Sequence, residues 1–375
     1  MIIGVPRETH LHEFRVGLNP FATRRLAQQG HTVVVESRAG EAAHFTDRNY
    51  QEAGGQIVYN PEEIYRRSDL VCRVGAISKD ELQLLKPDSV VCAFHHLAVL
   101  PREHVERLMK LEATLIGYEV ICDAKGDLPV LLPTSEMAGQ MAVHIAAHLL
   151  QKECGGRGIL LGSVAGVPPP TVLILGAGTV GRAAARQALA SGAHVIVLDT
   201  DLGKLQGLHR EFVGKAVTVL AEGERLHQYT AIADALIGAV LIPGARAPFL
   251  VTEAMVRKMK PGSVIIDVSI DQGGCIETSR PTTLNDPAFT LHGVVHYCVG
   301  NMTASIPRTA SRALASASVS YFEEIAGKGL DRALRDDPGL AAGVYLYRGE
   351  MVNERVGAAL KLAAKPLSQL LKGGR

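Results

Sequence analysis

One segment, residues 171–199, constrains the fold of this chain more than any other. An apolar run at 171–175 leads into Gly-Ala-Gly-Thr-Val-Gly at 176–181, which matches the pattern G-x-G-x-x-G. A helical pattern follows as far as Leu189, and a second apolar run at 194–198 ends in Asp199. In a βαβ unit such glycines permit a tight turn, close approach of a pyrophosphate and close packing of helix against strand. The segment therefore predicts a dinucleotide-binding fold.

The same segment predicts the cofactor. The helix N-terminus offers unpaired N–H groups and the positive end of the helix dipole, so we expect the loop to hold the phosphates. The expected contacts are Gly176, Gly178, Thr179, Val180 and Gly181. Asp199 follows Gly176 by 23 residues, where a carboxylate accepts hydrogen bonds from the ribose hydroxyls of NAD and repels the 2′-phosphate of NADP. NAD is the predicted cofactor.

Composition excludes several classes of protein. The 375 residues suffice for two domains, and 47% hydrophobic residues predict a large core. A net charge of +1 argues against nucleic acid or an anionic membrane as the main partner. The six cysteines are scattered without a C-x-x-C motif, which is typical of reduced thiols in a cytoplasmic protein. The chain opens with no signal-peptide pattern, and no apolar run is long enough to span a membrane.

Strands and helices alternate along the chain, which predicts α/β architecture with two doubly wound domains. A Rossmann domain is expected over residues 134–303, and a discontinuous substrate domain over 1–133 and 304–375, with ligands bound in the cleft between them. The expected strands are 2–5, 32–36, 70–74, 90–94, 114–118, 216–220, 235–237, 263–267 and 289–292, in parallel sheets. The expected helices are 21–29, 61–67, 79–85, 101–110, 135–152 (capped by Ser135), 306–327, 329–336 and 353–371.

Several longer motifs occur in a fixed order along nearly the whole chain. They are Met1-Ile-Ile-Gly-Val-Pro-Arg-Glu8 followed by Glu13-Phe-Arg-Val16, Phe94-His-His-Leu-Ala98, Ser135-Glu-Met-Ala-Gly139, Pro243-Gly-Ala-Arg-Ala-Pro248, Ile270-Asp-Gln-Gly-Gly274 and Asn301-Met302. With the glycine loop, they resemble the alanine dehydrogenase family, which includes the NAD-binding subunit of proton-pumping transhydrogenase. The resemblance implies reversible oxidative deamination of L-alanine to pyruvate and ammonia, with an amino acid or keto acid as the small-molecule partner.

The resemblance also assigns roles to individual residues. Arg15 would hold the substrate carboxylate, because a guanidinium binds carboxylates bidentately. His96, which follows the apolar run 90–94, would act as acid and base together with Asp271. Asn301 and Met302 would contact the substrate, as would Arg73. Further cofactor contacts are expected at Ser135, Lys204, Val240, Leu241, Ile270, Asp271 and Asn301.

The chain departs from the family at one position that bears on chemistry. Where the family reads Lys-Val-Lys-Glu-Pro, this chain reads Arg73-Val-Gly-Ala-Ile77, so the second lysine, which binds substrate in the family, is Gly75. Loss of one positioned charged donor costs about 2–4 kcal/mol of transition-state stabilisation. Gly75 either leaves the enzyme impaired or makes room for a larger amino acid or an opine-type substrate. A nucleotide-binding subunit without turnover is a further hypothesis, which the retained His96 and Asp271 disfavour.

Two other features are given plain interpretations. His144 and His148 are four residues apart on an expected helix but lack an adjoining glutamate and a third ligand, so we expect no metal site.

Family members are commonly hexameric, so we expect a homo-oligomer. The small apolar residues in 310–320 and 358–364 fit either contacts between subunits or an internal core.

Overall fold

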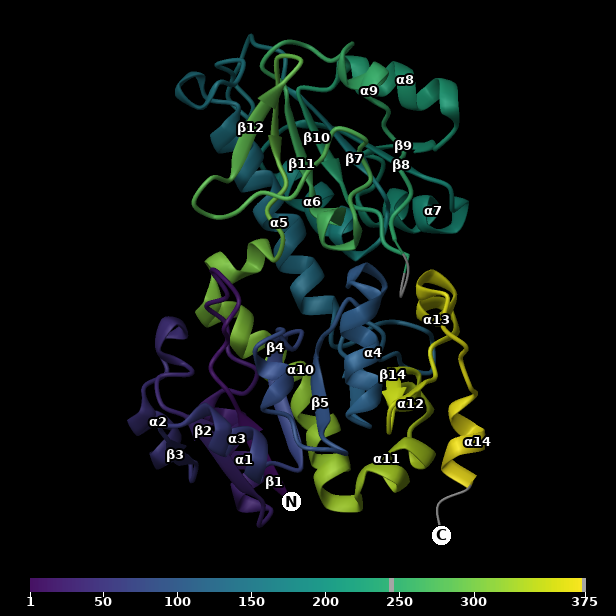
Figure 1. Cartoon of the computed structure of the whole chain (residues 1–375). Helices are drawn as coiled ribbons and strands as arrows, with labels where there is room; N and C mark the ends of the chain where they lie inside the picture. The colour runs from purple at the N-terminus through teal and green to yellow at the C-terminus, as the bar shows by residue number, and fades with distance from the viewer. Residues whose placement is uncertain (243–245, 373–375) are drawn as a thin grey trace. The chain divides into compact units, whose positions relative to one another are not determined.

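The computed structural model describes residues 1–242 and 246–372, which form two compact units (Figure 1). The first unit comprises Met1–Thr134 together with residues 304–372. The second comprises Ser135–Ile242 and Arg246–Thr303. Among the described residues, no helix is long and apolar enough to cross a membrane.

The first unit is built on a sheet that has eight strands within the described residues. Six of them are parallel, in the order β3-β2-β1-β4-β5-β6, and β14 and β15 continue the sheet antiparallel beyond β6. The strands are β1 (Ile2–Val5), β2 (Thr32–Glu36), β3 (Gln56–Val58), β4 (Leu70–Gly75), β5 (Val90–Phe94), β6 (Thr114–Gly117), β14 (Val344–Tyr347) and β15 (Glu350–Met351). The helices are α1 (Pro20–Gln28), α2 (Asp47–Glu52), α3 (Pro61–Arg67), α4 (Arg102–Lys110), α10 (Pro307–Lys328), α11 (Leu330–Asp336), α12 (Pro338–Ala342), α13 (Glu354–Leu360) and α14 (Leu367–Lys372).

The second unit repeats this strand order. Its parallel strands run β9-β8-β7-β10-β11-β13, and β12 pairs antiparallel with β13 at the edge. The strands are β7 (Thr171–Leu175), β8 (His194–Asp199), β9 (Val217–Leu220), β10 (Ala235–Gly238), β11 (Val264–Asp267), β12 (Ala288–Leu291) and β13 (Val294–Tyr297). The helices are α5 (Leu132–Leu149), α6 (Thr179–Ala190), α7 (Leu202–Glu211), α8 (Gly223–Ile232) and α9 (Glu253–Val256).

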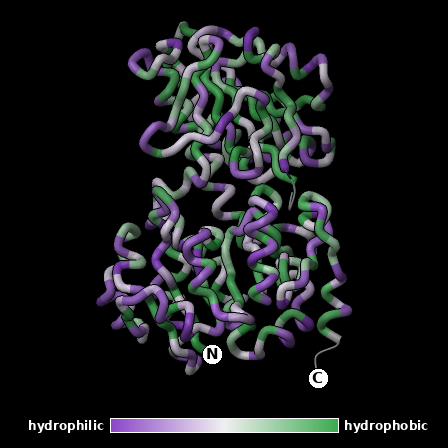
Figure 2. The backbone as a smooth tube through the Cα atoms, in the orientation of Figure 1, coloured by the Kyte–Doolittle hydropathy of each residue, from purple (hydrophilic) through white to green (hydrophobic). Residues whose placement is uncertain are grey.

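Each sheet is covered on both faces because successive strand residues point to opposite sides. In β2, Val33 and Val35 belong to a core cluster that includes Leu314 of α10, whereas Val34 packs in a separate cluster with Ile64 of α3. In the second unit, the strand residues fall in the same way into two clusters. Hydrophobic stretches accordingly concentrate in the strands (Figure 2). The predicted doubly wound α/β architecture is confirmed.

Several details of the predicted elements are wrong. The expected helix 79–85 is only a short 3₁₀ turn, Glu81–Gln83. The expected helix 353–371 is two helices, because Lys361 at the end of α13 adopts a left-handed conformation and Pro366 precedes α14. Helix α5 begins at Leu132, so Ser135 lies within its first turn and does not cap it. The second sheet is not wholly parallel, since a hairpin replaces the single expected strand 289–292.

Candidate functional site

The glycine loop lies where β7 ends and α6 begins, and its geometry fits a pyrophosphate. Gly176 has φ 106°, and an added Cβ would lie 2.3 Å from the Ala239 carbonyl oxygen. A Cβ on Gly181 would lie 1.8 Å from the Gly176 oxygen, so helix and strand approach too closely for any other residue. A Cβ on Gly178 would meet nothing within 4 Å, and no side chain caps the start of α6. The loop therefore combines an approachable backbone with uncapped helical N–H groups.

Asp199, the last residue of β8, is tied to this loop. Its Oδ2 accepts a hydrogen bond from the Ala177 N–H (2.6 Å), and its Oδ1 accepts one from the Asp201 N–H (2.8 Å). A carboxylate has about four acceptor positions, so both oxygens keep the capacity to accept ribose hydroxyls. Lys204 is exposed in the first turn of α7, where Asp201 caps its backbone N–H.

Strands β7 and β10 flank the point where the strand order reverses, which is where ligands bind in open α/β sheets. Val240 and Leu241 follow β10 at this point. The Val240 N–H donates to the hydroxyl of Ser269, which follows the neighbouring strand β11 (2.9 Å). The segment carrying both predicted cofactor residues is thus fixed to the loop that carries Asp271.

The loop after β11 is organised by a buried carboxylate. Asp267 accepts the backbone N–H groups of Ser269 and Cys275, both at 3.1 Å, and burial raises the pKa of its carboxyl group. Both oxygens of Asp271 accept the Asn301 N–H, at 3.1 and 3.2 Å. The structure therefore brings together Asp271 and Asn301, which are far apart in the sequence.

The remaining predicted residues of this unit are more buried. Ser135 and Ile270 are largely covered, and Met302 belongs to the hydrophobic core. The first three residues of the motif 243–248 lie outside the described residues, while the N–H of Ala247 donates to the Gln272 carbonyl at 2.9 Å.

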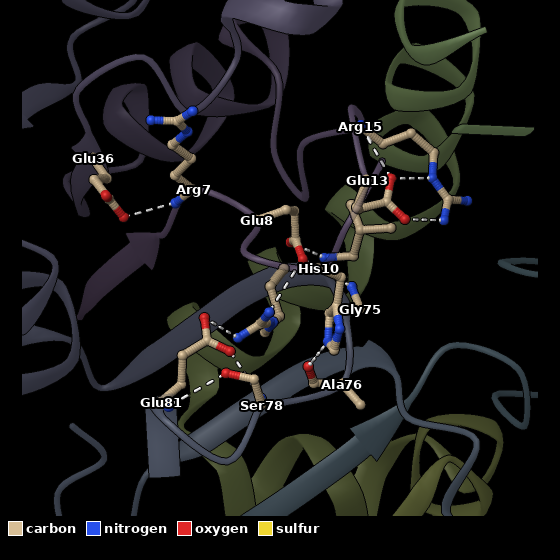
Figure 3. Close-up of polar contacts among 12 residues, drawn as sticks. Arg7, Glu8, His10, Glu13, Arg15, Glu36, Gly75, Ala76, Ser78 and Glu81 are labelled. Atoms are coloured by element: carbon tan, nitrogen blue, oxygen red, sulfur yellow. Dashed lines mark hydrogen bonds and ion pairs between the residues drawn. The ribbon is translucent and has the colours of Figure 1, made fainter. Parts of the chain in front are cut away.

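In the first unit, Arg15 follows β1 and is held by a nearby carboxylate (Figure 3). Its Nε and Nη2 donate to the two oxygens of Glu13 at 2.7 and 2.5 Å, and both side chains are 2% exposed. A two-point contact of this kind fixes the plane of a guanidinium. The Nε and Nη2 face of the guanidinium is therefore engaged by a protein carboxylate in this structure.

Arg73 lies at the centre of a buried charge network. Its guanidinium is 0% exposed and bonds to Glu8 (3.2 Å) and Glu81 (2.9 Å). Glu8 also accepts the N–H groups of Val74 (2.6 Å) and Gly75 (3.2 Å). Burial raises the pKa of the Glu8 carboxyl group, and the charge of Arg73 opposes that rise. The charge of Arg73, predicted to contact substrate, is engaged by protein carboxylates in this structure.

The space beside Gly75 is taken by His10 (Figure 3). A Cβ on Gly75 would lie 2.9 Å from His10 Cδ2 and 3.5 Å from Glu8 Oε2. His10 Nε2 donates to the Ala76 carbonyl oxygen at 2.7 Å, since a carbonyl only accepts. A Cβ at position 75 would therefore meet the His10 ring.

The two adjacent histidines after β5 have different environments. His95 is buried, its Nε2 bonds to the Val91 carbonyl at 3.2 Å, and burial lowers the pKa of its imidazole to about 4. His96 is half-buried, adopts φ 47° and ψ 41°, and stacks on Phe94 with ring centroids 6.2 Å apart. Its backbone N–H donates to Glu119 Oε1 at 2.7 Å. Of the two histidines, only His96 is partly exposed, so only His96 remains a candidate for proton transfer.

Sequence reasoning missed four residues of this region: Glu8, His10, Glu13 and Glu119. Glu8 and Glu13 stand inside the quoted motif, but a carboxylate beside an arginine gives no local signal of which groups it will bind. His10 bonds to Ala76, 66 positions away, and Glu119 bonds to His96, 23 positions away. Only the tertiary structure brings these residues together. The described residues contain no group of three or more side chains suited to hold a metal ion.

Comparisons with known proteins agree with this geometry. The family model described as "Alanine dehydrogenase/PNT, N-terminal domain" matches residues 4–138, and the corresponding C-terminal domain model matches residues 142–354. The chain is 41% identical over 360 residues to an alanine dehydrogenase of Mycobacterium tuberculosis strain H37Rv, covering 96% of this chain and 97% of that protein. It is 42% identical to an alanine dehydrogenase of Staphylococcus saprophyticus, covering 99% of this chain and all of the relative.

Two solved structures also resemble this chain. A structure titled L-alanine dehydrogenase superposes with a TM-score of 0.89 at 40% identity, covering 96% of this chain and 99% of that chain. A transhydrogenase from Sinorhizobium meliloti superposes with a TM-score of 0.80 at 24% identity, which extends the likeness of fold. Matches to both domain models and to full-length relatives lead to one conclusion: the chain belongs to the alanine dehydrogenase/PNT family.

Proposed function

We propose that this protein is an NAD-dependent dehydrogenase that converts L-alanine reversibly to pyruvate and ammonia. The observation that carries the proposal is the similarity to alanine dehydrogenases, about 41% identity over nearly the full length of both proteins. The glycine loop and the carboxylate at the end of β8 support the choice of a dinucleotide. The larger-substrate and opine-type alternatives are not favoured by these relatives, which are alanine dehydrogenases, and the His10 ring lies where a Cβ of residue 75 would be.

The second unit would hold NAD, which accepts the hydride from the substrate Cα. Residues 176–181 would bind the pyrophosphate through backbone N–H groups, and Asp199 would accept the ribose hydroxyls. Lys204, Val240, Leu241, Ile270 and Ser135 complete the proposed cofactor contacts. Asn301, whose backbone is fixed by Asp271, would present its amide to cofactor and substrate.

The first unit would bind the substrate carboxylate through Arg15, whose plane Glu13 fixes. His96 would take a proton from the substrate ammonium and release it to solvent. It would then take a proton from the water that attacks the imine carbon and return that proton to the nitrogen, which leaves as ammonia when the carbonyl forms. Asp271 would orient the amine or that water as a hydrogen-bond acceptor. Arg73 would position Glu8 and the end of β4, and Met302 would support Asn301 from the core.

A direct test is NADH formation followed by absorbance, with purified protein, NAD and L-alanine. The reverse reaction uses pyruvate, ammonium and NADH, and 2-aminobutyrate and longer L-amino acids test substrate size. We expect L-alanine to be the best substrate. A faster rate with a longer amino acid, or no turnover in either direction, would contradict the proposal.

The residue assignments have their own test. We expect His96→Ala and Asp271→Ala to lower kcat by about 10²–10⁴ while the affinity for NAD changes by at most a few-fold. The loss of proton transfer by His96, or of the orientation that Asp271 gives to the amine or water, acts on the chemical step. The exposed residues His194 and Asp127 supply matched controls, and His194→Ala and Asp127→Ala should keep full activity. Unchanged kcat in both site variants would place the chemistry elsewhere.

A homo-oligomer in the cytoplasm completes the proposal. The hexameric state is inferred from family resemblance, and the six cysteines, all free in the structure, fit a reducing compartment.

A further inference from the structure

His96 has a backbone conformation that a residue with a side chain rarely adopts. Its φ of 47° and ψ of 41° lie in the left-handed region, which residues other than glycine adopt uncommonly, although asparagine, aspartate and histidine do so more often than the rest. Such a conformation persists only when surrounding contacts determine it. At this position it sets the direction of the imidazole as the chain leaves β5 and enters the 3₁₀ turn Leu97–Val99.

Glu119 supplies a contact that fixes the peptide unit leading into this conformation. It lies just beyond β6, the strand beside β5, and its Oε1 accepts the His96 N–H at 2.7 Å. Glu119 is 2% exposed, so the bond forms away from competing water. A hydrogen bond from a backbone N–H to a carboxylate is among the stronger kinds in proteins.

The carboxylate is itself fixed by a third segment of the chain. Tyr345 of β14 donates its hydroxyl to the same Oε1 at 3.0 Å. The ring can lie there only because residue 117 is glycine, since a Cβ on Gly117 would be 2.2 Å from Tyr345 Cε2. The residue two positions beyond the end of β5, a residue just beyond β6, and a residue of β14 are thus joined through one oxygen atom, Glu119 Oε1.

The rest of the carboxylate does little for stability. Glu119 Oε2 is buried and has no hydrogen-bond partner among the described residues. A buried acceptor without a partner destabilises a fold, so its presence in a native structure calls for an explanation. The one oxygen that is used holds the backbone of the candidate acid–base residue.

We propose that Glu119 is a positioning residue that holds the His96 backbone in its left-handed conformation, and that Tyr345 orients Glu119 for this task. The inference rests on the proposed role of His96 in proton transfer. The proposal implies that Tyr345, which lies 249 positions after His96 in the sequence, affects the rate of the chemical step.

The test compares substitutions that keep or remove the acceptor oxygen. Glu119→Leu removes it, and we expect kcat for L-alanine to fall about 10- to 100-fold, because misplaced acid–base groups cost this much. The KM for NAD should stay within a few-fold of the unmodified protein. Glu119→Gln keeps an acceptor and should retain activity within a few-fold. Equal kcat for Glu119→Leu and the unmodified protein would overturn the proposal.

Two further comparisons separate positioning from general damage. In a His96→Ala background, Glu119→Leu should cause no additional loss of kcat, whereas a merely structural effect would add to it. Tyr345→Phe should lower kcat several-fold, while the matched Tyr50→Phe, which removes another buried hydroxyl that bonds to the Leu18 carbonyl, should not. An additive double variant, or equal effects of the two tyrosine substitutions, would refute the positioning role.

A readout independent of turnover distinguishes failure of this inference from failure of the proposed function. Hydrogen exchange of the His96 amide, followed by NMR, should be slow in the unmodified protein and faster in Tyr345→Phe and Glu119→Leu. Unchanged exchange in Tyr345→Phe and Glu119→Leu would disprove the contact, whatever the substrate. Absent alanine turnover together with the expected change in exchange would reject only the proposed reaction.

Discussion

At the scale of single residues, the first unit holds several charges away from water. Arg73 is 0% exposed and its guanidinium bonds to Glu8, Glu81 and the Tyr65 hydroxyl. Removing one partner of such a group leaves an uncompensated buried charge, which costs about 3–5 kcal/mol. The network therefore constrains the end of β4, including the backbone of Val74 and Gly75.

The contact between His10 and Gly75 predicts energetic coupling between them. Gly75→Lys should lower the free energy of unfolding by about 1 kcal/mol, because the new Cβ displaces the imidazole and breaks its bond to Ala76. In Gly75→Lys combined with His10→Ala, the two losses should be less than additive, by about 0.5 kcal/mol or more. Urea unfolding of the two single variants and the double variant measures this coupling. Strict additivity would show that the ring does not constrain position 75.

His95 predicts a pH dependence of stability. Burial lowers the pKa of its imidazole to about 4, below the value near 6.5 of an unfolded chain, so between these values the unfolded state binds more protons. Stability is therefore fully present above pH 6.5 and is lost as pH falls toward 4, by about 3 kcal/mol from this group.

The measurement is the free energy of unfolding at several pH values between 4 and 7, for the unmodified protein and for His95→Gln. The variant should show a shallower slope, because its amide does not titrate. The groups that act on His95, including Glu119, Arg73 and His96, are present in both proteins. Their own contributions to the slope of unfolding free energy against pH therefore largely cancel when the two slopes are compared. Parallel slopes would contradict a buried, neutral His95.

At the scale of elements, the candidate residues follow the carboxyl ends of parallel strands. In the second unit, the glycine loop follows β7, Asp199 ends β8, and Asp271 follows β11. In the first unit, Arg15 follows β1 and His96 follows β5. Parallel strands place these ends along one edge of a sheet, and the site at each edge is assembled from loops on a rigid base.

The carboxylate at the end of β8 predicts cofactor selectivity. The protein should bind NAD more tightly than NADP, and Asp199→Asn should raise the NADP-to-NAD affinity ratio by about tenfold or more, because the repulsion of a 2′-phosphate is removed. Titration calorimetry with both dinucleotides measures the ratio. Asp201→Asn, two residues away at the cap of α7, is the matched control and should leave the ratio unchanged. Tighter binding of NADP by the unmodified protein would refute the role of Asp199.

At the scale of the whole molecule, the chain uses one strand order twice, and its last segment returns to complete the first sheet with β14 and β15. The small residues of α10 face both ways: Ala310 and Ala315 are buried in the first unit, whereas Ser316 and Ser320 are exposed. The large apolar side chains left exposed, such as Phe21, Tyr59 and Phe249, remain available for contacts between copies.

The expected oligomer is tested by its mass in solution. Light scattering at micromolar concentration should give about six times the 40.0 kDa of one chain, as resemblance to hexameric family members implies. Charge-introducing Tyr59→Glu and Phe249→Glu should lower the mass if those side chains lie between subunits, and unfolding temperatures check that each variant is folded. A mass of one chain for the unmodified protein would refute the oligomer.

The sequence by itself determined the features that depend on local pattern. The glycine loop and the apolar strands around it predict the dinucleotide fold, because turn, phosphate approach and helix packing all require glycines at that spacing. The alternation of strands and helices predicts a doubly wound sheet, since parallel neighbours need crossover connections. The motifs that contain Arg15, His96 and Asp271 mark these residues as candidates through their resemblance to a family.

Only the tertiary structure decided which distant groups meet. It placed His10 against Gly75 and engaged Arg73 with Glu8 and Glu81. It joined Glu119 and Tyr345 to the His96 backbone, and it added the antiparallel strands β14 and β15 to the first sheet. These features depend on contacts between residues tens to hundreds of positions apart, and local propensity carries no information about which partner a buried charge or a sheet edge will find.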